Sequence, residues 1–475
     1  MGLEQGFTIH QPPASDRNEQ QDSQLVLELV VAGSLLPELV DGNTAIDFRT
    51  ADGKHVLRYS DLAVLDANER ALPATMQLTG CETETDTADS CQIQLVVNDS
   101  QAQYPITVDP IASSPDWVVT GDEDGITMGY AVYTAGDVNG DGYDDVIVSA
   151  PDYDLGNGAE GRVYVYHGSA NGPSTVADWT ADGDRGGAYF GTSAGTAGDV
   201  NDDGYDDVII GAPSPYAYAR WFGGSPGDTG RAFVYLGSAS GLVANPASII
   251  EGTVPDDEMG MAVSAAGDVN GDGYDDVIVG APSHDTDVTS PGRALVYHGS
   301  STGIDETQAD WYYDFPWQWS SFGWTVSTAG DVNGDDYDDI IIGTDWVEAV
   351  LVFHGSANGL SSEPDWGNQG APDPDNWEQF GYSVSTAGDV NNDGYDDVII
   401  GAPGYTDGQE EEGRAYIYYG SADGLSFNPD WTFESNLSGA ALGYRVATVG
   451  DVNNDGYDDL LVGLPYYSNC LLYTS

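Results

Sequence analysis

Short apolar runs alternate with clusters of glycine, asparagine and aspartate along most of this chain. Val208-Ile209-Ile210 is a typical β-branched run, and residues 414–419, Arg-Ala-Tyr-Ile-Tyr-Tyr, alternate as residues in a half-buried strand do. No segment carries apolar residues at helical spacing over ten or more positions. The pattern therefore predicts an all-β protein made of many short strands.

The strand pattern repeats with a nearly constant period. A loop of the form Gly-Asp-Val-Asn-x-Asp-Gly-Tyr-Asp-Asp recurs six times with little change, and its first aspartates lie 58 to 69 residues apart, at Asp137, Asp199, Asp268, Asp331, Asp389 and Asp451. An apolar-glycine pair such as Phe380-Gly381 precedes each loop, and a β-branched run with Gly-Ala-Pro or a variant follows it. Each unit is predicted to form a sheet of four strands. One such small sheet cannot bury both of its faces alone, so neighbouring sheets are expected to pack against one another as the blades of a propeller. A sandwich or a barrel would not explain the constant period.

Residues 1–110 lack the repeat. Strand-like runs over residues 25–31 and 92–97 predict a small β-rich, sandwich-like domain there, and residues 111–469 form the predicted propeller. The only lysine, Lys54, lies in the first part, which supports a boundary between the two.

The charge balance excludes whole classes of partner. The 475 residues include 79 acidic and 12 basic side chains, a formal net charge of −67. Binding to nucleic acid needs clusters of lysine and arginine, and an anionic membrane surface would repel this chain.

No apolar run approaches the roughly 18–20 residues that span a bilayer, so no direct membrane insertion is expected, and no signal peptide is visible after Met1.

The three cysteines bear on two separate questions, the redox compartment of the protein and the origin of its last residues. Cys81 and Cys91 bracket a polar tip, which predicts a hairpin closed by a disulfide in an oxidising compartment; two free thiols are the alternative. Cys470 begins the last six residues, 470–475, which resemble a translated adapter sequence from library preparation. We interpret them as a sequencing artefact and expect the natural protein to continue beyond Asn469.

The repeated loop carries the chemistry. Counted from its first aspartate, positions 1, 3, 5 and 9 bear side-chain oxygens, position 6 is a glycine that admits a sharp turn, and position 7 offers a backbone carbonyl. Hard oxygen donors, three of them carboxylates, suit Ca²⁺ better than Mg²⁺. Acidic turns without a metal are the alternative. An EF-hand is excluded because position 12 is apolar in every copy, and transition-metal sites would need His or Cys.

Together these motifs resemble FG-GAP repeats, the blades of the integrin alpha propeller and of many bacterial surface and secreted proteins. The resemblance covers residues 115–467 and implies a seven-bladed propeller, truncated here after six repeat starts, with up to six Ca²⁺ ions. The implied metal ligands are Asp137, Asn139, Asp141, Tyr143, Asp145, Asp199, Asn201, Asp203, Tyr205, Asp207, Asp268, Asn270, Asp272, Tyr274, Asp276, Asp331, Asn333, Asp335, Tyr337, Asp339, Asp389, Asn391, Asp393, Tyr395, Asp397, Asp451, Asn453, Asp455, Tyr457 and Asp459.

The fourth loop departs from the family pattern. Asp336 stands where the other copies have glycine, and Gly343-Thr344-Asp345 replaces Gly-Ala-Pro. Aspartate tolerates a left-handed backbone better than most residues but at a cost, so this loop is expected to be the weakest site.

Two aromatic insertions stand outside the repeat. They are candidates for ligand binding and contain Tyr216, Tyr218 and Trp221 in one segment and Tyr313, Trp317 and Trp319 in the other. In the propeller that the resemblance implies, both lie on the face opposite the calcium loops, where they are expected to bind a protein or glycan ligand. Packing against neighbouring blades is the alternative.

The sequence therefore predicts a non-enzymatic, calcium-binding propeller, secreted or on a cell surface, that serves cell adhesion or recognition of a protein or glycan. A scaffold propeller for a hydrolase domain missing from this fragment is one alternative, and a lectin is another. The arginines that open the third strand of a blade, at Arg162, Arg231, Arg293 and Arg414, are expected to form salt bridges between strands or blades.

Overall fold

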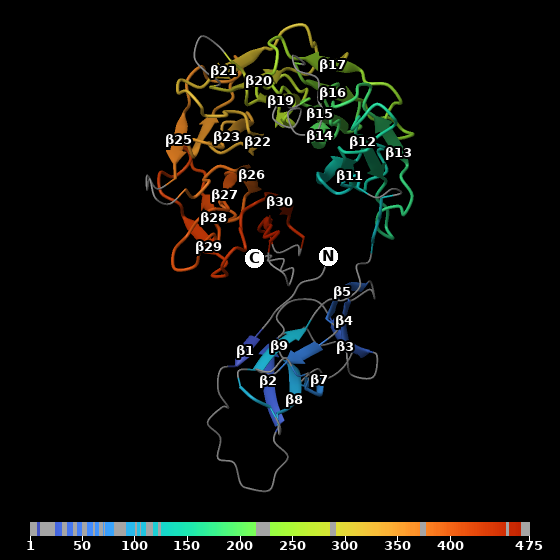
Figure 1. Cartoon of the computed structure of the whole chain (residues 1–475), viewed down its shortest axis with the longest axis vertical. Helices are drawn as coiled ribbons and strands as arrows, with labels where there is room; N and C mark the ends of the chain where they lie inside the picture. Colours follow the sequence, from blue (N-terminus) through green and yellow to red (C-terminus); the bar gives the residue numbers. More distant parts are fainter. Residues whose placement is uncertain are drawn as a thin grey trace. The chain divides into compact units, whose positions relative to one another are not determined.

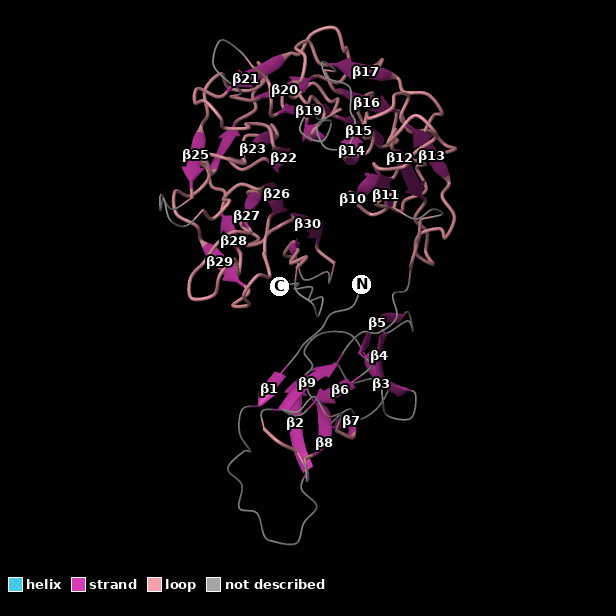
Figure 2. Ribbon diagram, viewed as in Figure 1, coloured by secondary structure: helices cyan, strands magenta, loops and turns pink. Residues whose placement is uncertain are grey.

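The computed structural model describes the larger part of the chain. The described residues are 7–9, 24–30, 36–40, 45–49, 55–59, 62–65, 70, 72–79, 92–99, 102–104, 106–110, 117–121, 125–214, 229–285, 291–370, 377–452 and 456–466. The chain divides into two compact units, built mainly on Met1–Asp116 and on Trp117–Cys470. Across the described residues, every regular element is a strand (Figure 2). None of them forms a helix that is long and apolar enough to cross a membrane.

The described strands of the first unit form three small sheets. In sheet order these are β1 (Phe7–Ile9), β9 (Ile106–Pro110) and β6 (Leu62–Leu65); β2 (Gln24–Val30), β8 (Gln92–Asn98) and β7 (Ala74–Thr79); and β3 (Leu36–Val40), β4 (Ala45–Arg49) and β5 (His55–Tyr59). Phe48, Met76, Leu95 and Ile106 come from all three sheets and share one core. The strand predictions over 25–31 and 92–97 are confirmed by β2 and β8, which pair with each other. The sandwich architecture stays a prediction, and Cys81, Cys91 and Cys470 lie outside the described residues.

The second unit repeats one four-stranded antiparallel sheet. The complete sheets are β10 (Val132–Gly136), β11 (Asp145–Ala150), β12 (Arg162–Tyr166) and β13 (Trp179–Asp182); β14 (Ser193–Gly198), β15 (Asp207–Ala212), β16 (Arg231–Tyr235) and β17 (Ser248–Glu251); β18 (Ala262–Gly267), β19 (Asp276–Ala281), β20 (Arg293–Tyr297) and β21 (Trp311–Asp314); β22 (Thr325–Gly330), β23 (Asp339–Gly343), β24 (Ala349–Phe353) and β25 (Trp366–Gln369); β26 (Ser383–Gly388), β27 (Asp397–Ala402), β28 (Arg414–Tyr418) and β29 (Trp431–Glu434). A further pair is formed by β30 (Val446–Gly450) and β31 (Asp459–Val462). Figure 1 shows the sheets around a common centre, with their first strands innermost. The predicted propeller of four-stranded blades is confirmed.

Blades pack face to face through their apolar side chains. Every residue of β15, β19 and β27 is buried, which explains why the second strand reads as a continuous apolar run. The apolar residue of the apolar-glycine pair packs between blades: Phe190, for example, is buried with Val163 of the preceding blade and Ile210 of its own. Stacking of neighbours thus buries the faces that one sheet would leave exposed.

The outer strands are joined to the next blade by their tryptophans. The indole N–H of Trp366 donates to the Ser426 carbonyl at 2.9 Å, and its ring meets Tyr418 edge-on at 5.0 Å. Trp179 and Trp311 repeat this contact, and so does Trp117, which lies before the first complete blade. The third-strand arginines form the predicted ion pairs, Arg162–Asp182, Arg293–Asp314 and Arg414–Glu434 between strands and Arg231–Asp184 between blades.

Candidate functional site

The six acidic loops connect the first and second strands of successive blades. We number them loop 1 to loop 6: residues 137–145, 199–207, 268–276, 331–339, 389–397 and 451–459. The register of the first and second strands shifts just before each loop, as between Thr134 and Gly136. Gly136 adopts a φ of 73° there, so the chain leaves the strand through a bulge that only glycine accommodates easily.

The position 1 aspartate curls each loop around its own carboxylate. In loop 1, Asp137 Oδ1 accepts a hydrogen bond from the Asp141 N–H at 3.0 Å, and Asp137 Oδ2 accepts one from the Gly142 N–H at 2.7 Å. Loops 2 to 5 repeat both bonds within 0.2 Å. Gly142 has a φ of 87°, the left-handed turn expected at position 6. These bonds, and the one from the Tyr143 N–H to Asp141 Oδ1, close the loop into a tight turn.

The position 9 aspartate lies beneath the loop and is buried. Asp207 Oδ2 accepts a hydrogen bond from the Val200 N–H at 3.0 Å, and Oδ1 accepts one from the Gly237 N–H at 2.7 Å. Burial outweighs these two bonds and raises the pKa of Asp207 to about 7. The same burial raises the pKa of Asp276 to about 8, of Asp339 to about 8 and of Asp397 to about 7, and it raises that of Asp145. For Asp207, Asp276, Asp339 and Asp397, the main interactions that oppose this rise come from backbone N–H groups, and no cationic side chain of the described residues is among them.

Two of the position 3 asparagines bear on whether a cation fits, whereas in loop 3 Asn270 Oδ1 accepts a hydrogen bond from the Asp272 N–H at 2.8 Å. The Oδ1 atoms of Asn201 and Asn391 are buried and accept no hydrogen bond. A buried amide oxygen without a donor is costly, and a hard cation beside it would satisfy it. The donor set of aspartate, asparagine and carbonyl oxygens at positions 1, 3, 5, 7 and 9 therefore fits Ca²⁺.

Within the described part of the chain, no three acidic, His or Cys side chains already converge as a metal cluster. The position 1 and position 9 carboxylates turn toward backbone N–H groups instead. Asp137 Oδ1 and Oδ2 each accept one such bond and keep a second lone pair, whereas Asp268 Oδ1 accepts two. In loop 6, Asn453 and Asp455 lie outside the described residues, whereas Asp451, Tyr457 and Asp459 lie within them. Loop 4 keeps the common form, and Asp336 adopts a φ of 69° where the other loops have glycine.

One residue of the loop was missed by sequence reasoning. Position 8, the first member of the Asp-Asp pair, is aspartate in all six loops, and this constancy was the available signal. In loop 2 its carboxylate leaves its own loop, and Asp206 Oδ2 accepts a hydrogen bond from the Asp137 N–H of loop 1 at 2.7 Å.

The aromatic candidates separate into three groups. Tyr216, Tyr218 and Trp221 lie outside the described residues. Tyr313 packs against Phe322 and Phe353, with ring centroids 5.7 and 5.0 Å apart. Trp317 and Trp319 are exposed in the segment between β21 and β22. Because neighbouring strands are antiparallel, this segment leaves the sheet at the end opposite the acidic loops.

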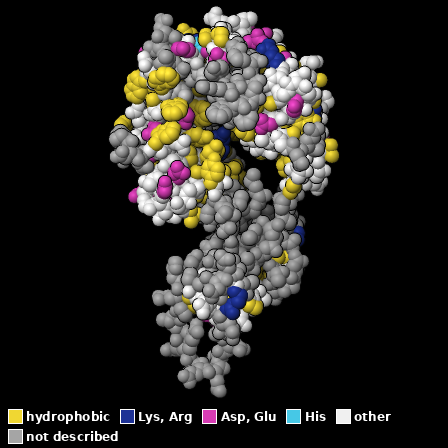
Figure 3. Space-filling model, in the orientation of Figure 1, with side chains coloured by type: hydrophobic (Ala, Val, Ile, Leu, Met, Phe, Trp, Pro, Cys, Tyr) yellow, Lys and Arg dark blue, Asp and Glu magenta, His cyan; other side chains and the backbone are white. Residues whose placement is uncertain are grey.

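A second exposed pair at that end was not predicted. Trp346, between β23 and β24, stacks on Trp377, just before β26, with ring centroids 5.5 Å apart. Both rings are exposed, Trp346 by 63%. Figure 3 shows hydrophobic side chains gathered over the blades β22–β25 and β26–β29. Tryptophans outside the repeat pattern were the signal that could have identified this pair.

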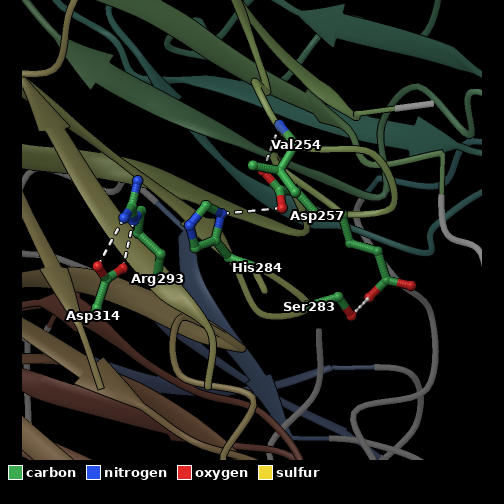
Figure 4. Close-up of polar contacts among 7 residues, drawn as sticks. Val254, Asp257, Ser283, His284, Arg293 and Asp314 are labelled. Carbon is green, nitrogen blue, oxygen red and sulfur yellow. Dashed lines mark hydrogen bonds and ion pairs between the residues drawn. The ribbon is translucent and has the colours of Figure 1, made fainter. Parts of the chain in front are cut away.

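His284 and Asp257 form a buried polar pair at the third blade, with Ser283 next to His284 in the chain. Figure 4 shows His284 and Asp257 pointing toward one another, with His284 Nδ1 3.0 Å from Asp257 Oδ1, and both side chains are buried. The neighbouring Ser283 hydroxyl donates to Glu258 rather than to His284. The group therefore lacks the nucleophile-to-base hydrogen bond of a Ser-His-Asp triad.

Comparison with protein families gives a match to the second unit. The model described as "FG-GAP repeat" matches residues 128–166, 190–235, 259–297, 322–353, 380–418 and 442–470. Each matched segment starts at the apolar-glycine pair and includes one acidic loop.

The curated relatives include integrin alpha chains. Integrin alpha pat-2 of Caenorhabditis briggsae is 34% identical over 232 residues, covering 44% of this chain and 18% of the relative. Integrin alpha-5 of Xenopus laevis is 30% identical, covering 48% and 21%, and integrin alpha-PS2 of Drosophila melanogaster is 36% identical, covering 35% and 12%. The chain thus spans about a fifth or less of the length of these relatives. A solved structure titled as BBS1N in complex with ARL6DN aligns with 76% of this chain and 86% of its own at 10% identity and a TM-score of 0.41.

Proposed function

Because this chain is an FG-GAP repeat protein resembling the propellers of integrin alpha chains, we propose that it is a calcium-stabilised module for adhesion or ligand recognition outside the cell. The repeats and relatives support the integrin-like propeller and its use in adhesion or recognition. Calcium, the ligand-binding face and the extracellular location are our proposals.

The calcium proposal is carried by one observation: equivalent oxygen donors recur in register in every acidic loop. Positions 1, 5 and 9 supply carboxylates, position 3 supplies an amide oxygen and position 7 a carbonyl. The unpartnered Oδ1 atoms of Asn201 and Asn391 support this assignment. Calcium accepts six to eight oxygen ligands, and water completes the shell where the protein supplies fewer.

Calcium in these loops would be structural. Each loop joins the innermost strand of a blade to the strand beside it, so its order determines how these two strands pair. At ten times the dissociation constant, each ion bound only by the folded protein adds about 1.4 kcal/mol to the free energy of unfolding. Six independent sites would together add on the order of 8 kcal/mol, which is comparable with the stability of a whole domain.

Calcium binding and thermal unfolding test the proposal together. Chelation should lower the melting temperature at fixed ionic strength, and restoring millimolar Ca²⁺ should recover it. Asp203→Ala, at position 5 of loop 2, should reduce the number of bound ions by one. Asp202→Asn changes the neighbouring exposed position, which is not a proposed ligand, and should leave the count unchanged. A protein that binds no ion in millimolar calcium and melts identically with chelator would refute the assignment.

We propose that the ligand binds at the end of the propeller opposite the acidic loops. Trp319 and Trp346 are each 63% exposed there, and large exposed aromatic rings are typical anchors of recognition surfaces. A protein ligand is the first candidate because the curated relatives are integrins. The exposed tryptophans also suit a glycan, since an indole ring offers a flat apolar face and an N–H donor.

Single substitutions of the exposed tryptophans test whether these rings bind a ligand or stabilise the fold. Trp319→Ala and Trp346→Ala should weaken capture on protein and glycan arrays while leaving the melting temperature within about 1 °C, because both rings are exposed. Phe427→Ser is the matched control: Phe427 is an exposed aromatic residue between β28 and β29, at the end that carries the acidic loops. Equal loss of capture in the control, or unfolding of the tryptophan variants, would contradict the assignment.

We propose no catalytic role for this unit. The buried His284–Asp257 pair lacks a nucleophile in hydrogen-bond contact, which favours a structural role. A scaffold attached to a hydrolase domain is the alternative, and hydrolase activity in the product of the intact gene would favour it.

A further inference from the structure

The position 8 aspartates connect each acidic loop to the loop before it. We call five of them the latch aspartates: Asp206, Asp275, Asp338, Asp396 and Asp458. In each case Oδ2 accepts a hydrogen bond from the position 1 N–H of the preceding loop. These distances are 2.7 Å for Asp206 with Asp137, 2.8 Å for Asp275 with Asp199, 2.8 Å for Asp338 with Asp268, 2.9 Å for Asp396 with Asp331 and 3.0 Å for Asp458 with Asp389. One contact thus recurs between all consecutive acidic loops.

The same residue also holds the other backbone group of position 1. The N–H of Asp275 donates to the Asp199 carbonyl at 3.2 Å, and the other latch aspartates make the same bond at 3.2 to 3.4 Å. Both backbone groups of a proposed calcium ligand are therefore fixed by a single residue of the next blade. The position 1 residue cannot shift without breaking this pair of bonds.

The surrounding packing makes the contact specific. A Cβ atom at Gly198, just before loop 2, would overlap the carboxylate of Asp275, and Gly136, Gly267, Gly330 and Gly388 are equally close to their latch aspartates. The Tyr337 ring also covers Gly271 of loop 3. Glycine at these positions leaves room for the next blade to approach.

The position of the latch in the loop gives it a role beyond structure. Tyr274 and Asp276, at positions 7 and 9 of loop 3, are proposed ligands of the same ion, and Asp275 lies between them. An ion that fixes positions 7 and 9 also restricts the backbone of position 8. Asp275 in turn holds Asp199, the first ligand of loop 2. Order in one loop therefore favours order in the preceding one.

We propose that the latch aspartates couple neighbouring acidic loops, so that calcium bound in one loop strengthens binding in the loop before it. This inference rests on the calcium proposal above. It assigns a positioning role to a residue that is not itself a proposed ligand. Coupling through a shared element that both sites order makes binding cooperative, and typical coupling changes affinity by about 5- to 150-fold.

The chain provides its own control. Asp144 occupies position 8 of loop 1, but no preceding acidic loop lies in the described part of the chain, and its side chain is exposed. Asp144→Ala therefore removes the same group from the same motif without removing a contact to another loop. Asp275→Ala removes a latch, and Asp275→Asn restores a neutral hydrogen-bond acceptor in its place.

Calcium titration of the purified chain tests the coupling. The unaltered protein and Asp144→Ala should bind with a Hill coefficient above 1. Asp275→Ala should lower the Hill coefficient and weaken binding in the loops it uncouples by about five- to tenfold, and Asp275→Asn should recover part of the loss. Amide exchange gives a readout without calcium: the Asp199 N–H should exchange faster in Asp275→Ala than in Asp144→Ala.

The outcomes distinguish this inference from the function it rests on. An unaltered protein that binds no calcium would overturn both. Calcium binding with independent sites, or identical titrations for Asp275→Ala and Asp144→Ala, would overturn the coupling and leave structural calcium standing. If Asp275→Ala does not fold, the comparison of Asp206→Ala with Asp144→Ala decides, because Asp206 forms the same contact with Asp137, and equal Hill coefficients there would overturn the coupling.

Discussion

At the scale of single residues, position 6 of the acidic loops shows how backbone geometry limits side-chain choice. Asp336 holds a φ of 69° and still donates its N–H to Asp331 Oδ2 at 2.8 Å, as the glycines do. A side chain in this left-handed region costs free energy, although aspartate tolerates it better than most residues. Asp336→Gly should therefore stabilise the protein by about 0.5–1 kcal/mol and tighten calcium binding in loop 4.

Thermal unfolding in saturating calcium measures the effect of Asp336→Gly. Gly273→Asp is the reverse change in loop 3, where Gly273 has a φ of 90°. It should destabilise by a similar amount. A lower melting temperature for Asp336→Gly would mean that the aspartate makes a favourable contribution that outweighs its backbone strain.

The residues of the acidic loop were predictable to different degrees. The proposed ligand positions 1, 3, 5 and 9 follow from spacing within one loop, because oxygens on nearby residues could converge on one ion. The partner of the latch residue does not, since Asp275 contacts Asp199, 76 residues earlier in the chain. A repeated aspartate indicates that the position matters, but only the stacking of blades reveals what it contacts.

At the scale of elements, the outer-strand tryptophans determine how firmly one blade holds the next. Trp366 is 8% exposed and contacts Ser426 and Tyr418 of the following blade, whereas Trp431, at the same repeat position, is 40% exposed. Trp366→Ala should cost about 3–5 kcal/mol, the usual range for a buried aromatic ring, and Trp431→Ala about 1 kcal/mol. Chemical denaturation of both variants in calcium measures the difference. Equal costs would show that the contact with the next blade contributes little.

The strands of the second unit were easier to predict than those of the first, because the same apolar pattern recurs in each blade. The second strands, such as Asp207–Ala212, are buried along their whole length, so their apolar runs are unambiguous and recur in each blade. In the first unit each pattern occurs once. Its strands β2 and β8 were found from composition, but the three-sheet arrangement depends on pairings such as β1 with β9, about 100 residues apart in the chain.

At the scale of the whole molecule, the net charge of −67 opposes folding. Like charges repel most strongly in the compact state, and this repulsion decreases as salt shortens the screening length from about 30 Å at 0.01 M to about 10 Å at 0.1 M. Six calcium ions would neutralise only 12 of these charges, so most of the repulsion remains even in the saturated protein. Stability should therefore depend on ionic strength with and without calcium.

Raising NaCl from about 0.01 to about 0.5 M in the presence of chelator should raise the melting temperature by roughly 3 °C, which corresponds to about 2 kcal/mol for a unit of about 350 residues. Tetramethylammonium chloride at the same concentrations should raise the melting temperature by a similar amount, because screening depends on ionic strength and not on cation identity. With saturating calcium the slope should be shallower but still positive, since the loops are partly neutralised while the remaining surface is not. A melting temperature independent of both salts would mean that the acidic side chains are compensated locally, and it would remove long-range repulsion as a reason for the proposed calcium binding.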